Sequence, residues 1–224
     1  MEWDLDLFKL GFCSSNRDVE GPFRAAVDSL SWRREIAGYH VREYRRIISN
    51  WGEIGPETPI ADAMDVLFTR ESRSVTLPCE SHLIAAAQSI HAMHDFMAVI
   101  LYYGLRIDKK HQFKLKSLGF NNLLDKFGSD LPVSVRKQFD LHKGSDKYRY
   151  LNAFVNRAKH TSLVRAGLSV DFVDNRGGFR IKAFKYHDEH YPQKWSDVFI
   201  ADLNLTWAGL AKIGTQFEKS QVWF

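Results

Sequence analysis

The chain is poor in cysteine and has no long apolar run. Cys13 and Cys79 lie far apart and outside any metal-binding spacing, which favours a reducing compartment and predicts a cytoplasmic protein. The longest unbroken apolar stretch, residues 96–105, is about half as long as a bilayer span, so we expect no membrane partner. The first six residues are acidic and contain no basic segment, so we expect no secretory signal peptide.

Motifs of several enzyme classes are also missing. The chain has no glycine-rich phosphate loop and no Gly-x-Ser-x-Gly elbow, and neither cysteine has a catalytic partner in the sequence. These absences argue against a P-loop nucleotide hydrolase and against an α/β-hydrolase. We predict no cofactor and no bound metal.

Glutamate is absent from the middle of the chain. Residues 106–185 hold 18 Lys and Arg against seven Asp, a net charge of +11, whereas residues 1–105 carry −5 and residues 186–224 carry −2. Concentrated positive charge suits a polyanion such as RNA or DNA. The alternative is that the basic segment faces the acidic one, within a monomer or across a dimer.

Length and hydrophobic periodicity predict one ordered helical domain. The chain has 224 residues, 45% of them apolar, which is enough for a single domain over residues 1–224. An irregular apolar arm at 1–16 is expected to pack on the body or on a partner. Helical periodicity predicts helices at 22–50, 60–68, 79–105, 118–127, 132–141, 146–163 and 196–219.

The two longest predicted helices carry clear apolar stripes. In the helix at 22–50 the stripe contains Phe23, Val27, Leu30, Ile36, Tyr39 and Ile47. In the helix at 79–105 it contains Ala86, Ile90, Met93, Met97, Ile100 and Gly104. Both sets repeat at intervals of three and four residues, as expected for helices that face a core.

After residue 163 the apolar pattern changes to a period of two. Apolar residues alternate with polar ones over 168–172 and again over 179–183, and the turn signal Asp-Asn-Arg-Gly-Gly lies between them at 174–178. We predict a β-hairpin over about residues 166–186, followed by a loop at 186–192. The expected fold class is mainly α: a helical bundle with an inserted β-hairpin.

Residues 148–160 contain the strongest functional signal. Asn156 and His160 are four residues apart and share one face of a predicted helix, in a strip with Arg149 and Ala153. Metal-free RNA cleavage needs a side chain that titrates near neutrality, and positive charge at the phosphorus. His160 is therefore the predicted acid–base catalyst, and Asn156 would orient it. The predicted phosphate contacts are Arg157, Lys159, Arg149 and Lys143. The alternative is that Asn156 and His160 cap or bridge neighbouring helices.

The element order and the segment Asn-Arg-Ala-Lys-His at 156–160 resemble the HEPN superfamily. The resemblance covers about residues 22–163 and 196–219 by architecture. It implies a metal-independent endoribonuclease of an antiviral defence or toxin–antitoxin system, with a site formed by two motif helices in a homodimer. The family motif has an Arg directly before the Asn, where this chain has Val155. The alternative is a catalytically inactive HEPN-like module that binds RNA, a nucleotide or a partner protein.

Three other clusters have weaker functional interpretations. His91 and Asp95 are one helical turn apart and could support the motif helix, or could bind a metal together with His94. The segment His-Asp-Glu-His at 187–190 is another cluster of metal-ligand types, although such loops are usually solvated. The predicted hairpin carries Arg176, Arg180, Lys182 and Lys185 beside Phe184 and Tyr186. These residues could grip a nucleic-acid backbone or form an ordinary polar face.

Overall fold

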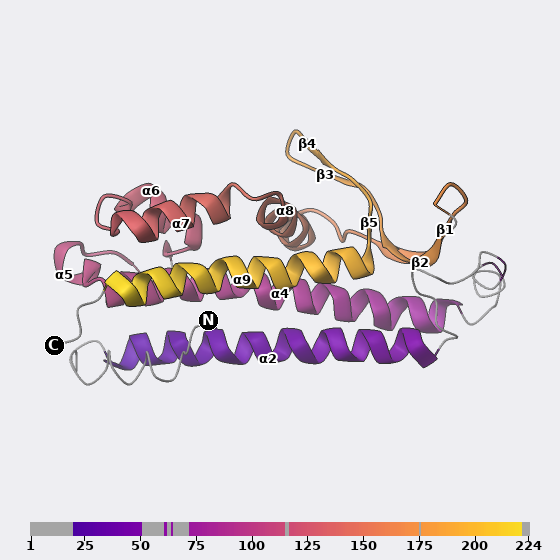
Figure 1. Ribbon diagram of the computed structural model, residues 1–224, viewed down its shortest axis with the longest axis horizontal. Coiled ribbons are helices and arrows are strands. Elements are labelled where there is room, and N and C mark those ends of the chain that lie inside the picture. The colour runs from indigo at the N-terminus through magenta and orange to yellow at the C-terminus, as the bar shows by residue number, and fades with distance from the viewer. Residues whose placement is uncertain are drawn as a thin grey trace. The chain divides into compact units, whose positions relative to one another are not determined.

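The computed structural model describes residues 20–50, 61, 64, 72–114, 117–174 and 176–220 (Figure 1). Its helices are α2 (Glu20–Asn50), α4 (Ser72–Gly104), α5 (Ile107–Lys110), α6 (Phe120–Phe127), α7 (Val133–Lys143), α8 (Asp146–His160) and α9 (Ser196–Ser220). Its strands are β1 (Ala166–Asp171), β2 (Arg176–Ile181), β3 (Phe184–Tyr186), β4 (Glu189–Tyr191) and β5 (Lys194–Trp195). The predicted mainly α fold is confirmed. The predicted arm at 1–16 and most of the predicted helix at 60–68 lie outside the described residues.

The chain divides into two compact units. The first contains the described residues of 1–35, 89–149 and 205–224, and the second contains those of 36–88 and 150–204. Helices α2, α4, α8 and α9 each contribute residues to both units. The single-domain prediction therefore stays a prediction, and the units are described one at a time.

Helix α4 is the most apolar element of the chain. All six residues of its predicted stripe are buried, as the three-and-four spacing indicated. The helix has the length and composition of a membrane span, but 56% of its most apolar window is buried inside the fold. Core helices of water-soluble proteins have the same properties, so this is weak evidence for a membrane.

Helix α4 also begins earlier than predicted. The sequence indicated a start at Cys79, directly after Pro78, because proline lacks an N–H and disfavours helix interiors. The structure extends α4 back to Ser72 with Pro78 inside it. Ser74, whose carbonyl the missing N–H would bond, is exposed to solvent, and this lowers the cost of the proline.

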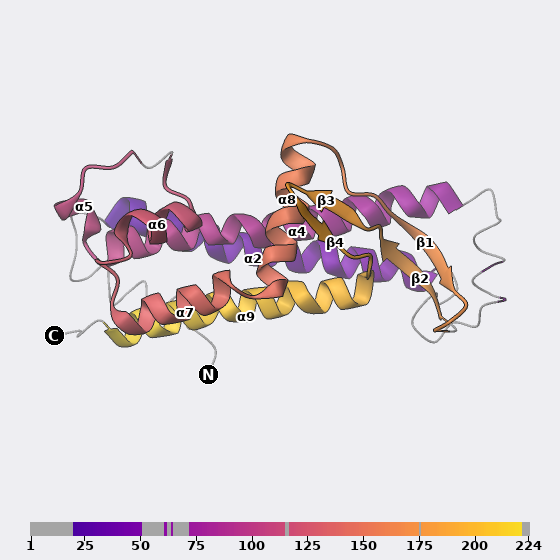
Figure 2. The same cartoon turned by 90° about the horizontal axis from the view of Figure 1, so that it is seen from above.

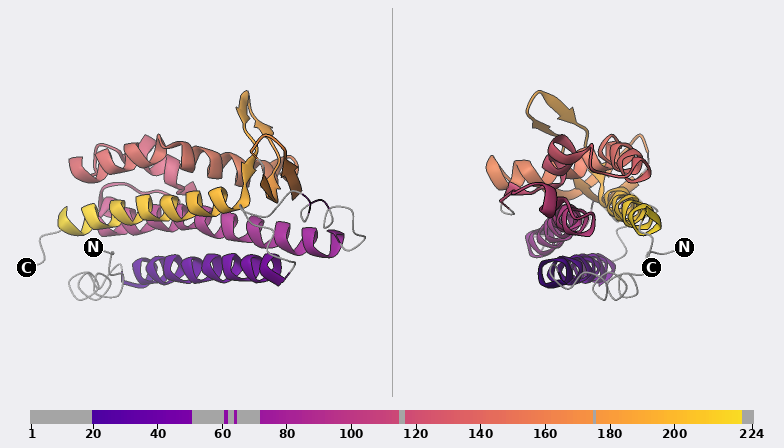
Figure 3. Two further views of the ribbon diagram at one scale, coloured as in Figure 1. Left: turned by 45° about the vertical axis from the view of Figure 1, so that its right-hand side comes forward. Right: turned by 90° about the vertical axis from the view of Figure 1, so that its left-hand side faces the viewer.

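Aromatic rings and close helix contacts build the first unit. The rings of Phe120 and Phe139 stack with centroids 3.9 Å apart. Helix α7 runs along the C-terminal part of α9 (Figures 2 and 3). The ring of His142 lies directly over Gly209. The first unit therefore places glycine where another element must approach closely.

A buried histidine pair lies in the same core. His94 is 1% exposed, and its Nε2 lies 2.9 Å from Nε2 of His142. Nδ1 of His94 lies 3.0 Å from the carbonyl oxygen of Ile90, so it donates there and Nε2 accepts from His142. Burial lowers the pKa of His142 to about 4, and burial together with the neighbouring imidazoles lowers the pKa of His94 well below its ordinary value. Both imidazoles are neutral near pH 7.

The second unit contains the strands (Figure 2). β1 and β2 pair antiparallel with Ala166 opposite Ile181, which confirms the predicted hairpin, and β5 pairs with β2 on its other side. The buried carboxylate of Glu80 on α4 accepts hydrogen bonds from the backbone N–H of Ala166 and from Nε of Arg165, both at 2.8 Å. These two bonds fix the start of β1 to α4.

The predicted loop at 186–192 is wrong, because β3 and β4 form a second hairpin there. Phe184 stands opposite Tyr191, and their rings stack with centroids 5.0 Å apart. His187 takes a left-handed conformation, with φ of 52°, and this lets the chain reverse within two residues. The alternation of apolar and polar residues along the strand also ends at Ile181 instead of continuing to Ala183, because the chain leaves β2 to enter the second hairpin.

The stripe predicted for α2 is wrong at one residue of the second unit. Tyr39 is 51% exposed, whereas Ala37 and Tyr44 are buried. The Tyr39 ring instead makes edge contacts with the imidazoles of His40 and His82. Over a long helix the buried face drifts around the axis, so a fixed set of apolar positions fails near the helix centre.

We predict that Gly104→Ala lowers the free energy of unfolding by about 1–3 kcal/mol, because a Cβ at position 104 would overlap the fully buried ring of Phe217. Gly21→Ala is the matched control, since no atom lies within 4 Å of its added Cβ. Denaturant unfolding measures both. The double variant Gly104→Ala with Phe217→Leu should regain part of the lost stability. A Gly104→Ala protein as stable as wild type would contradict this packing.

The histidine pair predicts a loss of stability in mild acid. The folded pKa of His142 lies below its unfolded value, so its contribution is complete above pH 6.5 and falls as the pH drops toward about 4. The total loss from His142 is about 3 kcal/mol. The free energy of unfolding should fall as the pH is lowered from 7 to 5. His142→Gln should reduce the slope of unfolding free energy against pH by up to the equivalent of about one proton. A flat wild-type profile would contradict the pair.

Candidate functional site

The second-unit part of α8 is anchored by aromatic packing. Phe154 is 2% exposed, and its ring lies 5.1 Å from that of Phe199 and 6.2 Å from that of Phe184. Tyr150 adds edge contacts to the same two rings. α8, β3 and α9 therefore share one apolar cluster, and it fixes which face of α8 remains open.

Two positions of the motif helix are fully buried. Val155 and Ala153 are each 0% exposed, so the predicted polar strip through Ala153 is not continuous. Valine at position 155 is a core residue, and an Arg there would have to enter an apolar environment. This position has no chemical role in the chain.

Asn156 and His160 occupy different environments on α8. Asn156 is half-buried, and its Nδ2 donates to Oδ1 of Asn152 at 2.9 Å. His160 is the last residue of α8 and is exposed, as is Lys159 beside it. The C-terminal end of a helix carries partial negative charge, which favours these basic residues in its last turn. His160 is accessible to a substrate, whereas the side chain of Asn156 is hydrogen-bonded to a residue of its own helix.

Arg157 connects the end of α8 to the second hairpin. Its guanidinium Nη1 donates to the carbonyl oxygen of Lys185 on β3. The Arg157 side chain is half-buried and positions β3, and its role as a phosphate contact stays a prediction. The contact brings the hairpin up to the last turn of α8.

Most basic residues at 150–204 form ion pairs or other contacts, and a small group of exposed lysines forms no ion pair with a described residue. Of the basic residues at 150–204, four bind carboxylates: Arg165 to Glu80, Arg176 to Asp197, Arg180 to Asp171 and Lys194 to Asp202. Among the described residues, the exposed Lys159, Lys182 and Lys185 form no ion pair. Because carboxylates neutralise Arg176 and Arg180, these two arginines are less available to bind a nucleic-acid backbone than predicted.

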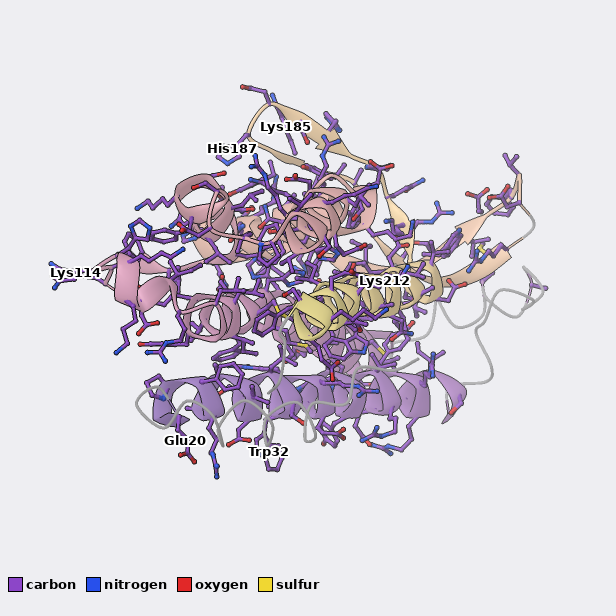
Figure 4. All side chains as sticks on the ribbon, turned by 60° about the vertical axis from the view of Figure 1, so that its left-hand side comes forward. Glu20, Trp32, Lys114, Lys185, His187 and Lys212 are labelled. Atoms are coloured by element: carbon purple, nitrogen blue, oxygen red, sulfur yellow. The ribbon has the colours of Figure 1, made fainter. Side chains whose placement is uncertain are left out.

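We use the term α8–β3 surface for Lys159, His160, Lys185 and His187. All four side chains are exposed, and Figure 4 shows Lys185 and His187 on the hairpin. The ring of His187 packs on Tyr186, with centroids 4.1 Å apart. The surface combines two ammonium groups, two imidazoles and one partly exposed aromatic ring, which are the groups that contact single-stranded nucleic acids.

The remaining predicted site residues belong to the first unit. Lys143 binds Asp125 at 3.3 Å, and Arg149 lies 3.9 Å from Asp146. Asp95 accepts a hydrogen bond from the backbone N–H of Phe120 at 3.2 Å, which caps the start of α6. His91 packs beside His94, with ring centroids 6.2 Å apart. Their predicted roles stay predictions.

The metal interpretations gain no geometric support. Within the described ranges, no three or more His, Cys, Asp or Glu side chains are grouped so as to hold a metal ion. His94 is used by the pair with His142, and Glu189 accepts a hydrogen bond from Tyr191 at 2.7 Å.

Comparisons of the chain with known protein families, with curated proteins and with solved structures find no match.

We predict that Arg157→Ala loosens the second hairpin while α8 stays folded, because the guanidinium bond to Lys185 is lost. Amide hydrogen exchange should become faster over residues 184–191. Lys159→Ala removes a neighbouring exposed cation of the same helix turn and should leave these rates unchanged. Equal exchange rates in the wild type and the Arg157 variant would show that the contact does not position β3.

Proposed function

We propose that this chain binds single-stranded RNA on the α8–β3 surface and cleaves it without a metal ion. The observation that carries the proposal is the Arg157 contact to Lys185, because it places an accessible imidazole and two unpaired lysines at one end of α8. Lysine ammonium groups attract the phosphates, and an imidazole can move protons near pH 7.

The proposed reaction is an internal transfer at phosphorus. The 2′-hydroxyl of one nucleotide attacks the adjacent phosphorus while an imidazole takes its proton. The bond from phosphorus to O5′ breaks, and an imidazolium gives a proton to the leaving oxygen. The products are a 2′,3′-cyclic phosphate and a 5′-hydroxyl. His160 of each copy in a homodimer would supply the two roles, as the resemblance to the HEPN superfamily implies.

The second candidate is an RNA-binding module without catalysis. The burial of Val155 favours it, because the position of the family's Arg lies in the core and offers no cation. Such a protein would use Lys159 and Lys185 as phosphate contacts and His160 as a hydrogen-bond partner. Binding without cleavage distinguishes it from the enzyme.

Cleavage of end-labelled RNA in the presence of EDTA tests the enzyme. Wild type should yield fragments ending in a cyclic phosphate, and His160→Ala should be slower by about 10²–10⁴-fold. The matched control is His111→Ala, an exposed imidazole of the first unit outside the surface. If His160→Ala cleaves as fast as wild type, His160 is not the catalyst. If wild type binds RNA but does not cleave it, the binding module replaces the enzyme.

Salt dependence tests the binding surface separately. Lys159→Ala with Lys185→Ala removes two phosphate contacts, so the slope of log affinity against log salt should become shallower by about 1.4. Lys212→Ala removes an exposed lysine of the first unit and should change neither slope nor affinity (Figure 4). If the double variant binds as wild type does, RNA contacts another surface.

A further inference from the structure

The second unit contains a cavity of about 240 Å³ that has no part in the proposed RNA site. Its walls come from the second-unit residues of α2, from β2 and β5, and from the first turns of α9. The apolar walls are Ile48, Phe179, Trp195, Ile200 and Ala201. The polar groups are Tyr44, Arg45, Arg176, Ser196, Asp197 and Asn204.

One wall of this cavity carries a guanidinium. Arg176 binds Asp197 through Nη2 at 2.5 Å, and its guanidinium lies 4.5 Å from the centre of the Trp195 ring. The Arg176 side chain is 19% exposed and lines the cavity. An anionic oxygen is the best acceptor for a guanidinium N–H.

Two further features favour an anion. Arg45 is an exposed lining residue that brings a second positive charge to the cavity, whereas Asp197 is already paired with Arg176. The hydroxyls of Tyr44 and Ser196 lie 2.5 Å apart, and one of them donates to the other, so one hydroxyl hydrogen remains for a ligand. Burial raises the pKa of Tyr44, which keeps its hydroxyl neutral.

The size and the apolar walls of the cavity restrict the organic part of this anion. A dry cavity of about 150 Å³ is enough for a benzene ring. The cavity here leaves room for one ring and one acidic group, with Phe179 and Ile200 buried along its side. A bare inorganic anion would leave this apolar surface uncovered.

We propose that the cavity binds a small organic anion, made of one ring-sized apolar body and a carboxylate or phosphate. The ring lies against Phe179, Ile200 and Ala201. The acidic group lies beside the guanidinium of Arg176 and faces Arg45. This inference does not depend on RNA cleavage, because none of its residues belongs to the α8–β3 surface.

Calorimetric titration with four probes separates the parts of the proposal. Phenyl phosphate and benzoate carry a ring and an anion, phenol carries the ring alone, and inorganic phosphate carries the anion alone. At least one of the two ring anions should bind at least tenfold more tightly than both phenol and inorganic phosphate. If neither ring anion binds, or if inorganic phosphate or phenol binds as tightly, the proposal is overturned.

Variants then locate the binding. Ala201 is an exposed residue at the cavity wall, and Ala201→Leu adds bulk there and should weaken the ring anion at least tenfold. Ala208→Leu makes the same change at an equally exposed position on α9 outside the cavity and should have no effect. Arg45→Gln is exposed, so it should fold normally and weaken the anion about threefold to tenfold. Equal affinities in the two leucine variants would place the binding elsewhere and overturn the proposal. Arg176→Gln should weaken the ring anion more than phenol, provided that its circular dichroism is native.

Discussion

The hydrogen bond from Arg157 to the carbonyl oxygen of Lys185 is the contact on which the proposed RNA site depends. Aromatic packing of Phe154 against Phe184 and Phe199 holds α8, β3 and α9 together, but such packing sets no direction for a hairpin. A guanidinium bonded to a main-chain oxygen does set one, because both groups have fixed hydrogen-bonding directions. This bond therefore brings Lys185 to the last turn of α8.

Neutralisation of charge explains why few of the cations at 150–204 are open for binding. Within the second unit, Arg176, Arg180 and Lys194 bind aspartates, and Arg165 binds the buried Glu80. These ion pairs connect the strands to each other and to the helices. Cations that hold a fold together are costly to redirect to a ligand, because each would leave its carboxylate unpaired. The lysines without a carboxylate are therefore better candidates for phosphate contacts than the arginines.

The sequence predicted regular elements well and long-range partners poorly. The α4 stripe and the first hairpin were predictable, because burial repeats with the period of each element. The second hairpin was not, because it depends on the stacking of Phe184 on Tyr191 and on a left-handed His187. The buried pair of His94 and His142 was not predictable either, because the two residues lie 48 positions apart and no local pattern joins them. The cavity likewise combines residues of α2 with β2, β5 and α9, which lie far from α2 in the sequence.

Mapping a short single-stranded RNA onto the isotope-labelled protein by NMR tests the central claim most directly. The account predicts shift changes concentrated in residues 157–160 and 184–191, with the imidazole signals of His160 and His187 among the largest. It also predicts that these changes weaken as salt rises, since phosphate contacts supply the affinity. RNA-induced shifts that avoid both segments would contradict the account, whatever the affinity.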